Sequence, residues 1–169
     1  MKIAKYKQAN NPHTPREVLL ELSKSKNTKV LIGLVLNPNV PKEILIEFAN
    51  TYKNLDSKAR IREFYTDKYN RIVCAMVSNQ NVPLEVLEML YDEYNPGYFR
   101  HINIMSLNEN LPIEMLIKLS KHPEYIIRRN VVENPHTPTE TLMELTQDKD
   151  WIVAIRAKQN RINRIELLS

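Results

Sequence analysis

The sequence predicts an all-α protein, a solenoid of about five to six tandem two-helix repeats with a period of 26 residues. Three observations indicate this fold. One short phrase returns six times along the 169 residues, apolar residues follow it at helical spacing, and the chain has 10 prolines but only 2 glycines. Few glycines disfavour a turn-rich β-sandwich, and prolines that recur at fixed places mark the starts of helices.

The repeated phrase begins with Asn, and its clearest copy runs from Asn134 to Glu140 as Asn-Pro-His-Thr-Pro-Thr-Glu. Every copy keeps the first Asn, a Glu six residues later and a Leu eight residues later. Three columns in register predict a single helical-repeat domain over residues 1–169, with an insertion at about 53–68. The repeats start at Asn11, Asn37, Asn79, Asn108, Asn134 and Asn160.

Each part of the phrase has a predicted role at a helix end. Proline at the fifth place suits the first turn of a helix, where its missing N–H would have no partner. Thr14 and Thr137 precede such prolines and are expected to act as N-caps, with the Glu of the phrase completing a capping box. The opening Asn follows the second helix, and we expect it to take the left-handed conformation that Asn tolerates. The prolines are Pro15, Pro41, Pro83, Pro112 and Pro138.

The phrase and the segment around it resemble the leucine-rich repeat variant family. The matching pattern is Asn-Pro-x-Thr-Pro-x-Glu-x-Leu-x-x-Leu, together with the segment from Ile127 to Pro135, and the resemblance covers residues 11–168. It implies a right-handed superhelix of paired helices, in the style of HEAT and armadillo arrays. The family's arginine early in the second helix stands only at Arg128. The iron–sulfur domain of the founding type is not implied, since Cys74 is the single cysteine.

The sequence contains no arrangement of residues that is typical of catalysis or of cofactor binding. It lacks His-x-x-x-His, nucleophile-elbow and glycine-rich phosphate-binding motifs, and one cysteine cannot form a multi-cysteine metal site. His13 and His136 occupy one place in the repeat, which Asn39 fills in another copy, so we interpret them as turn residues and not as ligands. We therefore predict no enzyme activity, no cofactor and no metal. Without an apolar signal segment or a membrane-spanning stretch, the expected location is the cytoplasm.

Basic side chains form the one pattern that suggests a binding surface. Through Pro83 the chain has 14 Lys or Arg against 7 Asp or Glu, whereas the remainder has 10 against 13. Stacked helices lie about 8–10 Å apart, so cations at matching places in successive second helices would form a ridge. This ridge is either a solvated charged edge or a track for an acidic protein or a nucleic-acid backbone. The candidate residues are Lys29, Arg71 and Arg100, eight places before the next Asn, and Arg128, Arg129 and Arg156, slightly further along.

Two further segments lead to structural predictions. In the insertion, Ile61, Phe64 and Tyr65 share one helical face, which predicts a short amphipathic helix on the rim of the array; a flap that faces a partner is the alternative. Trp151 opens the second helix of the fifth unit, and we expect it to pack in the core or to cap the end instead of serving in recognition. Leucines at 167–168 close the last unit, which either folds back onto the fifth unit or pairs with another chain.

An extended array without a reactive constellation predicts a non-catalytic helical-repeat scaffold that mediates protein–protein interaction. The alternative is a nucleic-acid-binding helical-repeat protein that uses the basic ridge on its second helices. No membrane partner is expected. Binding to generic duplex DNA and RNA at low salt would distinguish the two functions, because backbone contacts to phosphates weaken steeply as salt rises.

Overall fold

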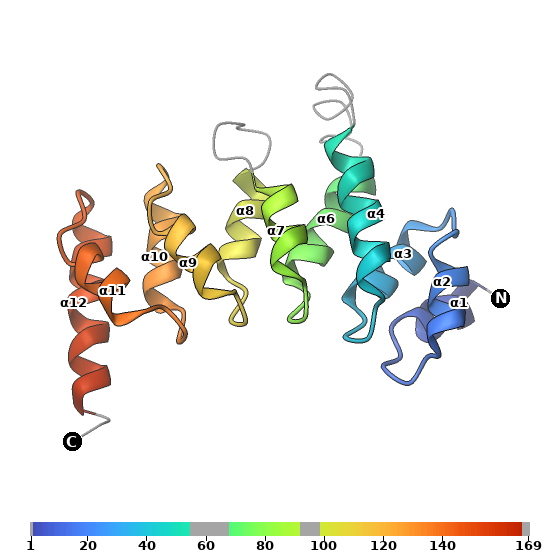
Figure 1. Cartoon of the computed structure of the whole chain (residues 1–169), viewed down its shortest axis with the longest axis horizontal. Coiled ribbons are helices and arrows are strands. Elements are labelled where there is room, and N and C mark those ends of the chain that lie inside the picture. Colours follow the sequence, from blue (N-terminus) through green and yellow to red (C-terminus); the bar gives the residue numbers. More distant parts are fainter. Residues whose placement is uncertain (1, 55–67, 92–98, 167–169) are drawn as a thin grey trace. The chain divides into compact units, whose positions relative to one another are not determined.

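The computed structural model describes residues 2–54, 68–91 and 99–166, and every regular element within these ranges is a helix (Figure 1). The predicted all-α class is thereby confirmed. The chain divides into two compact units, unit 1 with residues 1–104 and unit 2 with residues 105–169. The prediction of a single domain over residues 1–169 stays a prediction.

Unit 1 alternates the two kinds of helix that the repeat predicts. A helix at the start of the chain, α1, takes the place of a second helix, because Ala9 precedes Asn11 as Val35 precedes Asn37. Helix α3 packs against α1 and α6, and α4 packs against α6 and α7. The bounds are α1 (Lys2–Ala9), α2 (Arg16–Leu22), α3 (Thr28–Leu36), α4 (Lys42–Lys53), α6 (Lys68–Ser78), α7 (Leu84–Leu90) and α8 (Phe99–Ser106), whose last two residues belong to unit 2.

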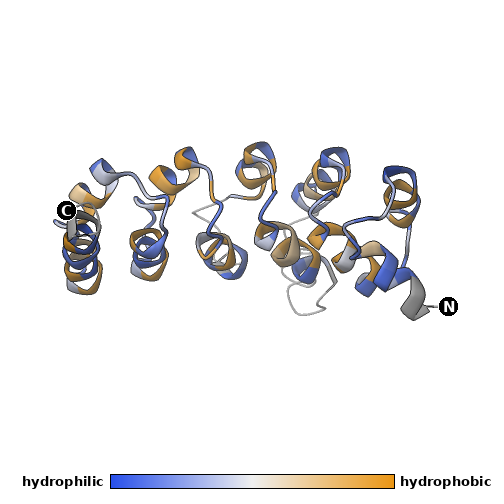
Figure 2. Ribbon diagram, turned by 90° about the horizontal axis from the view of Figure 1, so that it is seen from below, coloured by the Kyte–Doolittle hydropathy of each residue, from blue (hydrophilic) through white to orange (hydrophobic). Residues whose placement is uncertain are grey.

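Unit 2 contains two further pairs of helices, and its last helix, α12, packs against both α10 and α11. Figure 2 shows that the helices carry both hydrophobic and hydrophilic residues, as the packing of amphipathic helices requires. The bounds are α9 (Ile113–Leu119), α10 (Tyr125–Glu133), α11 (Thr139–Leu145) and α12 (Trp151–Glu166).

The leucine column of the repeat supplies the core of both units. Its five described members are all buried in the first helices. Burying one such side chain stabilises the fold by about 1.5–3 kcal/mol. This gain explains why Leu recurs at this place in the repeat. The members are Leu19, Leu45, Leu87, Leu116 and Leu142.

The opening Asn is buried in four copies of the phrase, at Asn37, Asn79, Asn108 and Asn134. At Asn37 and Asn134 the prediction of a left-handed conformation is wrong. Asn37 and Asn134 have extended φ/ψ angles of −64°/126° and −68°/127°. The Asn37 side-chain oxygen accepts the Asn39 amide at 2.9 Å, and its Nδ2 donates to the carbonyls of Ala9 and Asn11, both at 2.8 Å. The amide oxygen of Asn37 therefore stabilises the turn that follows it. The amide nitrogen donates to two carbonyls at and just beyond the end of α1.

The same hydrogen bonds recur within each unit. Asn79 donates from Nδ2 to the carbonyl of Val35 at 2.7 Å and to that of Asn37 at 3.1 Å. In unit 2, Asn134 donates to the carbonyl of Asn108 at 2.9 Å. Each Asn thus links its own phrase to the phrase before it, and we call Asn37, Asn79 and Asn134 the asparagine ladder.

The starts of the first helices differ from the predicted capping boxes. Pro15 and Pro138 occupy the N-cap place, and no side chain caps the helix that follows. The Thr14 hydroxyl donates to the carbonyl of Gln8, and Thr137 likewise donates to the carbonyl six residues before it. Both threonines therefore secure the turn to the preceding helix, so their predicted role as N-caps is wrong. The Glu of the phrase is exposed in the first helical turn, where the helix dipole favours a carboxylate.

Helix α12 runs through the sixth copy of the phrase and does not end at its Asn. This copy has Arg164 where the others have Pro, and an arginine N–H allows the helix to continue. Asn160 still donates from Nδ2 to the carbonyl of Val132 at 2.8 Å. Its Oδ1 is buried without a hydrogen-bond partner among the described residues, because residue 162 lies inside the helix and not in a turn.

Two predictions concern residues outside the described ranges, namely the amphipathic helix with Ile61, Phe64 and Tyr65 and the leucine pair at 167–168. In the described part of the chain, each helix is too short or too polar to cross a membrane.

Candidate binding surface

A hollow of about 920 Å³ lies across the second helices of unit 1. Tyr6 lines it from α1, Lys29 and Ile32 line it from α3, and Arg71 lines it from α6. The segment at the start of α3 completes the lining. We call this surface the basic hollow and define it by Tyr6, Lys26, Asn27, Thr28, Lys29, Ile32 and Arg71.

The basic hollow brings together two of the six predicted ridge residues, Lys29 and Arg71, because α3 and α6 pack side by side. Sequence reasoning missed Tyr6 and Lys26. A signal was available for Tyr6, since extending the repeat register backwards from Asn11 places it in the same column as Ile32.

Gly33 allows α1 to approach α3 beside the basic hollow. A Cβ atom at this position would lie 3.1 Å from Cδ2 and Cε2 of Tyr6 and 3.3 Å from the Tyr6 carbonyl oxygen. Glycine inside a helix lowers stability by about 1 kcal/mol relative to alanine. The close approach of Tyr6 explains why glycine nevertheless occupies position 33. Gly33 therefore helps to position the Tyr6 ring in the lining.

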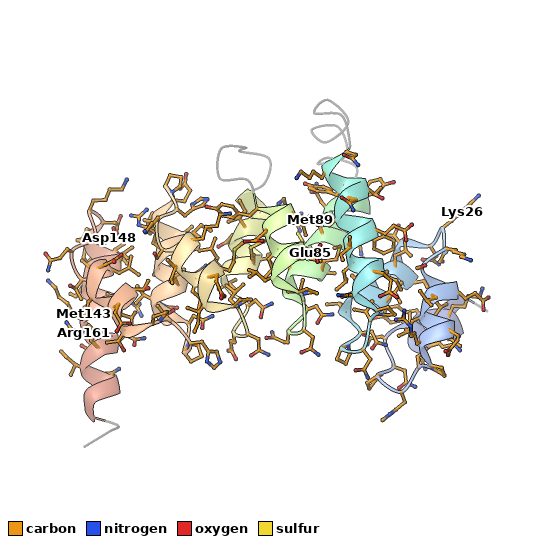
Figure 3. All side chains as sticks on the ribbon, viewed as in Figure 1. Lys26, Glu85, Met89, Met143, Asp148 and Arg161 are labelled. Carbon is orange, nitrogen blue, oxygen red and sulfur yellow. The ribbon has the colours of Figure 1, made fainter. Side chains whose placement is uncertain are left out.

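The charge of the basic hollow is positive. Lys26, Lys29 and Arg71 supply three cations, and none of the described residues that line the hollow is acidic. Lys26 extends from the loop between α2 and α3 (Figure 3). Cations around a concave surface concentrate a positive potential there, while Tyr6 and Ile32 add apolar area. The surface therefore suits a ligand that carries both anionic and apolar groups.

Three other predicted ridge residues lie outside the basic hollow. Arg100 is exposed on α8, and Arg129 on α10 is half-buried, with Nη2 3.3 Å from Oδ1 of Asn130. Arg156 on α12 is exposed and pairs with Glu133 at 3.5 Å. A binding role for these three arginines stays a prediction.

Arg128 is buried, so its predicted place on an exposed ridge is wrong. Only 4% of the residue is exposed. Its Nε and Nη2 donate to the two carboxylate oxygens of Asp148 at 2.7 and 2.8 Å, and its Nη1 donates to the carbonyls of His122 and Pro123, both at 2.8 Å. All three guanidinium nitrogens thus serve internal contacts, and none is available to a partner.

The ion pair shifts the pKa of both partners. Hydrogen bonds to Asp148 raise the pKa of Arg128. Burial by itself would raise the pKa of Asp148, but the Arg128 guanidinium and the Asp150 amide, which donates to Oδ1 at 2.8 Å, together lower it. Both groups therefore stay charged in the folded protein.

Trp151 is 73% exposed, so the prediction that it packs in the core is wrong. It stands on the first turn of α12, and the buried positions of that helix, Val153 and Ala157, lie on another face. Apolar residues occur on more than one face of α12, so the sequence did not show which face packs against α10 and α11.

His101 is buried and packs against other residues of unit 1. Its Nε2 lies 3.2 Å from the Leu90 carbonyl oxygen, and its ring meets the Tyr52 ring edge-on with 5.7 Å between centroids. Burial lowers the pKa of His101 to about 4, although the hydrogen bond to Leu90 acts in the opposite direction. In the parts of the chain that the structure describes, no cluster of His, Cys, Asp or Glu could hold a metal ion.

Residues 127–150 match the model of the leucine rich repeat variant family. The resemblance predicted from the sequence is confirmed for these residues. The comparisons found no match among curated proteins and none among solved structures. The segment that matches the leucine rich repeat variant model contains both Arg128 and Asp148.

Proposed function

We propose that the chain is a non-catalytic helical-repeat scaffold that binds another protein, and that the basic hollow receives an acidic segment of this partner. One observation carries the proposal: Lys26, Lys29 and Arg71 line a single hollow together with Tyr6 and Ile32. The leucine rich repeat variant family, which residues 127–150 match, is typically non-catalytic and often serves in protein interactions.

The size and chemistry of the basic hollow favour a peptide segment as its ligand. Single exposed ion pairs contribute at most about 1 kcal/mol, so three cations at the surface require additional apolar contact for useful affinity. Tyr6 and Ile32 supply that contact. A segment with two or three carboxylates beside an aromatic or aliphatic residue would use both features, and charge complementarity would accelerate its association.

We also propose that the repeats continue as one right-handed solenoid of about five to six units. The support is the 26-residue period of the sequence and the asparagine ladder, whose hydrogen bonds join successive phrases within each unit. Such an array offers an extended surface to partners.

Nucleic-acid binding is the second candidate function. It is favoured by the same three cations and by the exposed Tyr6 ring, on which a base could stack. The two candidates differ in their ligand but share a surface, so one set of variants tests both.

The experiment measures the fluorescence anisotropy of three labelled probes: an acidic peptide with one Phe among Glu residues, a generic duplex DNA and a single-stranded RNA. We expect saturable binding of the peptide at low salt that weakens about tenfold or more in the double variant Lys29→Glu/Arg71→Glu. Lys42→Glu is the matched control, since Lys42 is exposed on α4 outside the basic hollow.

The outcomes separate the candidates. If both nucleic acids bind more tightly than the peptide and lose affinity in the double variant, the nucleic-acid function replaces the protein-binding function. If no probe binds at low salt, or if the double variant binds the peptide as the wild type does, the basic hollow is not the site.

A further inference from the structure

Helix α12 carries an exposed apolar stripe in unit 2. Trp151, Ile155 and Ile162 are 73%, 57% and 50% exposed, although all three are large hydrophobic residues. At about 100° per residue they lie within about 40° of one another around the helix, and they extend over about 16 Å of its length. We call these three residues the Trp151 stripe.

The stripe is separate from the face that α12 uses inside unit 2. Val153 and Ala157 are fully buried where α12 packs against α10 and α11. Contiguous exposed apolar surface of this kind marks interaction sites in soluble proteins, whereas scattered single residues need no explanation. Three large side chains on one helical line are such a surface.

Cations accompany the Trp151 stripe. Lys158 is exposed and lies on the same line, between Ile155 and Ile162. Arg156 and Arg161 stand on the same helix, and between residues 151 and 163 α12 has no carboxylate. Arg156 forms an ion pair with Glu133. Lys158 is therefore the cation that stands beside the apolar side chains of the stripe.

We propose that the Trp151 stripe binds an acidic amphipathic helix of a partner protein. The partner helix would place apolar residues against Trp151, Ile155 and Ile162 and a carboxylate opposite Lys158. This is the helix-to-surface mode of recognition, in which apolar anchors recur at helical spacing. The proposal does not depend on the basic hollow, which lies in unit 1.

The charge pattern argues against two other occupants. A second copy of α12 laid antiparallel on the stripe would bring Lys158 near the Lys158 of the other copy, and like charges oppose such a contact. A bilayer that accepted Ile155 and Ile162 would also receive Lys158, which lies between them. An acidic helix, by contrast, uses the apolar residues and the cation together.

The test uses the intrinsic fluorescence of Trp151, which is the only tryptophan in the 169 residues. The probe is a designed helical peptide without Trp or Tyr that carries Leu along one face and Glu elsewhere. We expect a saturable shift of the emission maximum to shorter wavelength, because the indole leaves water on binding. A peptide of the same composition with its Leu residues scrambled around the helix should give no shift.

Variants connect the signal to the stripe. Ile155→Glu should weaken binding about tenfold or more, and Lys158→Glu should weaken it and reduce its salt dependence. Ile113→Glu is the matched control, because Ile113 is 53% exposed in unit 2 but lies on α9. The variant Lys29→Glu/Arg71→Glu should bind the Leu-Glu helix as the wild type does, so failure at the basic hollow and failure at the stripe are distinguishable.

Three results would overturn the proposal. One is the absence of any shift with the Leu-Glu helix while the circular dichroism of the protein is intact. Another is a shift with vesicles of anionic phospholipid but not with the peptide, which would indicate a membrane surface. The third is a shift that grows with protein concentration alone, together with a dimer in sedimentation, which would indicate a second copy.

Discussion

The Arg128 guanidinium in α10 forms a two-pronged ion pair with the Asp148 carboxylate in the loop before α12. Figure 3 shows Asp148 at the end of α11, in the loop that leads to α12. The same guanidinium donates to two carbonyls of the loop before α10. One side chain thus joins the loops of two successive repeats within unit 2.

Removing Arg128 should destabilise unit 2 strongly. In Arg128→Leu, the buried Asp148 carboxylate loses its counter-charge and the carbonyls of His122 and Pro123 lose their donor. We expect the free energy of unfolding to fall by about 3–5 kcal/mol in urea denaturation. Adding Asp148→Asn should restore part of this loss, since no uncompensated charge then remains.

Arg156→Ala is the control for this prediction. Arg156 also pairs with a carboxylate, that of Glu133, but both side chains are about half exposed. Its removal should change the free energy of unfolding by less than about 1 kcal/mol. Equal losses in Arg128→Leu and Arg156→Ala would contradict the role that we assign to the buried pair.

The asparagine ladder should contribute measurably to stability. Asn37→Ala removes two donated hydrogen bonds and one accepted bond in a buried setting, and it leaves the carbonyls of Ala9 and Asn11 without these donors. We expect a loss of about 2–3 kcal/mol in thermal or urea unfolding.

Asn39→Ala provides a matched comparison two residues away. Asn39 is exposed and its Nδ2 makes one bond, to the Pro12 carbonyl at 2.8 Å. Its replacement should cost about 1 kcal/mol or less. If Asn39→Ala proved as costly as Asn37→Ala, burial of the ladder would not be the reason for the Asn column.

Unit 1 should become less stable as the pH decreases, because of His101. The folded protein keeps this imidazole neutral, with a pKa of about 4, whereas an unfolded chain takes up the proton near pH 6.5. Stability is therefore full above pH 6.5 and declines as pH falls towards 4, and His101 alone should account for about 3 kcal/mol at the acid end. Urea unfolding at pH 7, 6, 5 and 4 measures this slope.

His101→Phe should reduce that slope, since a phenyl ring can pack edge-on against Tyr52 and cannot take up a proton. A His101→Phe profile that matched the wild-type profile would rule out His101 as the source.

Restoring proline to the sixth phrase should break α12. Arg164→Pro removes one N–H from the helix and introduces a clash with the carbonyl of Asn160, which together cost about 3 kcal/mol inside a helix. We expect reduced ellipticity at 222 nm and weaker binding of the Leu-Glu helix, since Ile162 would leave the line of Trp151 and Ile155. Arg164→Ala, which keeps the N–H, should preserve both properties.

Periodicity by itself determined the helices and the core of this protein. The phrase, its proline and its Leu column predict where the described first helices begin and which side chain they bury, as Leu87 and Leu116 show. These features depend on contacts between residues close in sequence and on helical spacing, which a single chain displays directly. The match of residues 127–150 to the leucine rich repeat variant model follows from the same pattern.

Tertiary structure decided the role of each polar or exposed side chain. Arg128 and Arg71 were both predicted to lie on one basic ridge, yet Arg128 is buried and its hydrogen bonds are accepted by Asp148, 20 residues further along. Trp151 is exposed because only one side of α12 packs against α10 and α11, and Asn37 is buried because carbonyls 26 and 28 residues earlier need its amide. Such roles depend on partners that are distant in sequence and come into contact only on folding. The spacing of neighbouring residues in the sequence does not reveal these contacts.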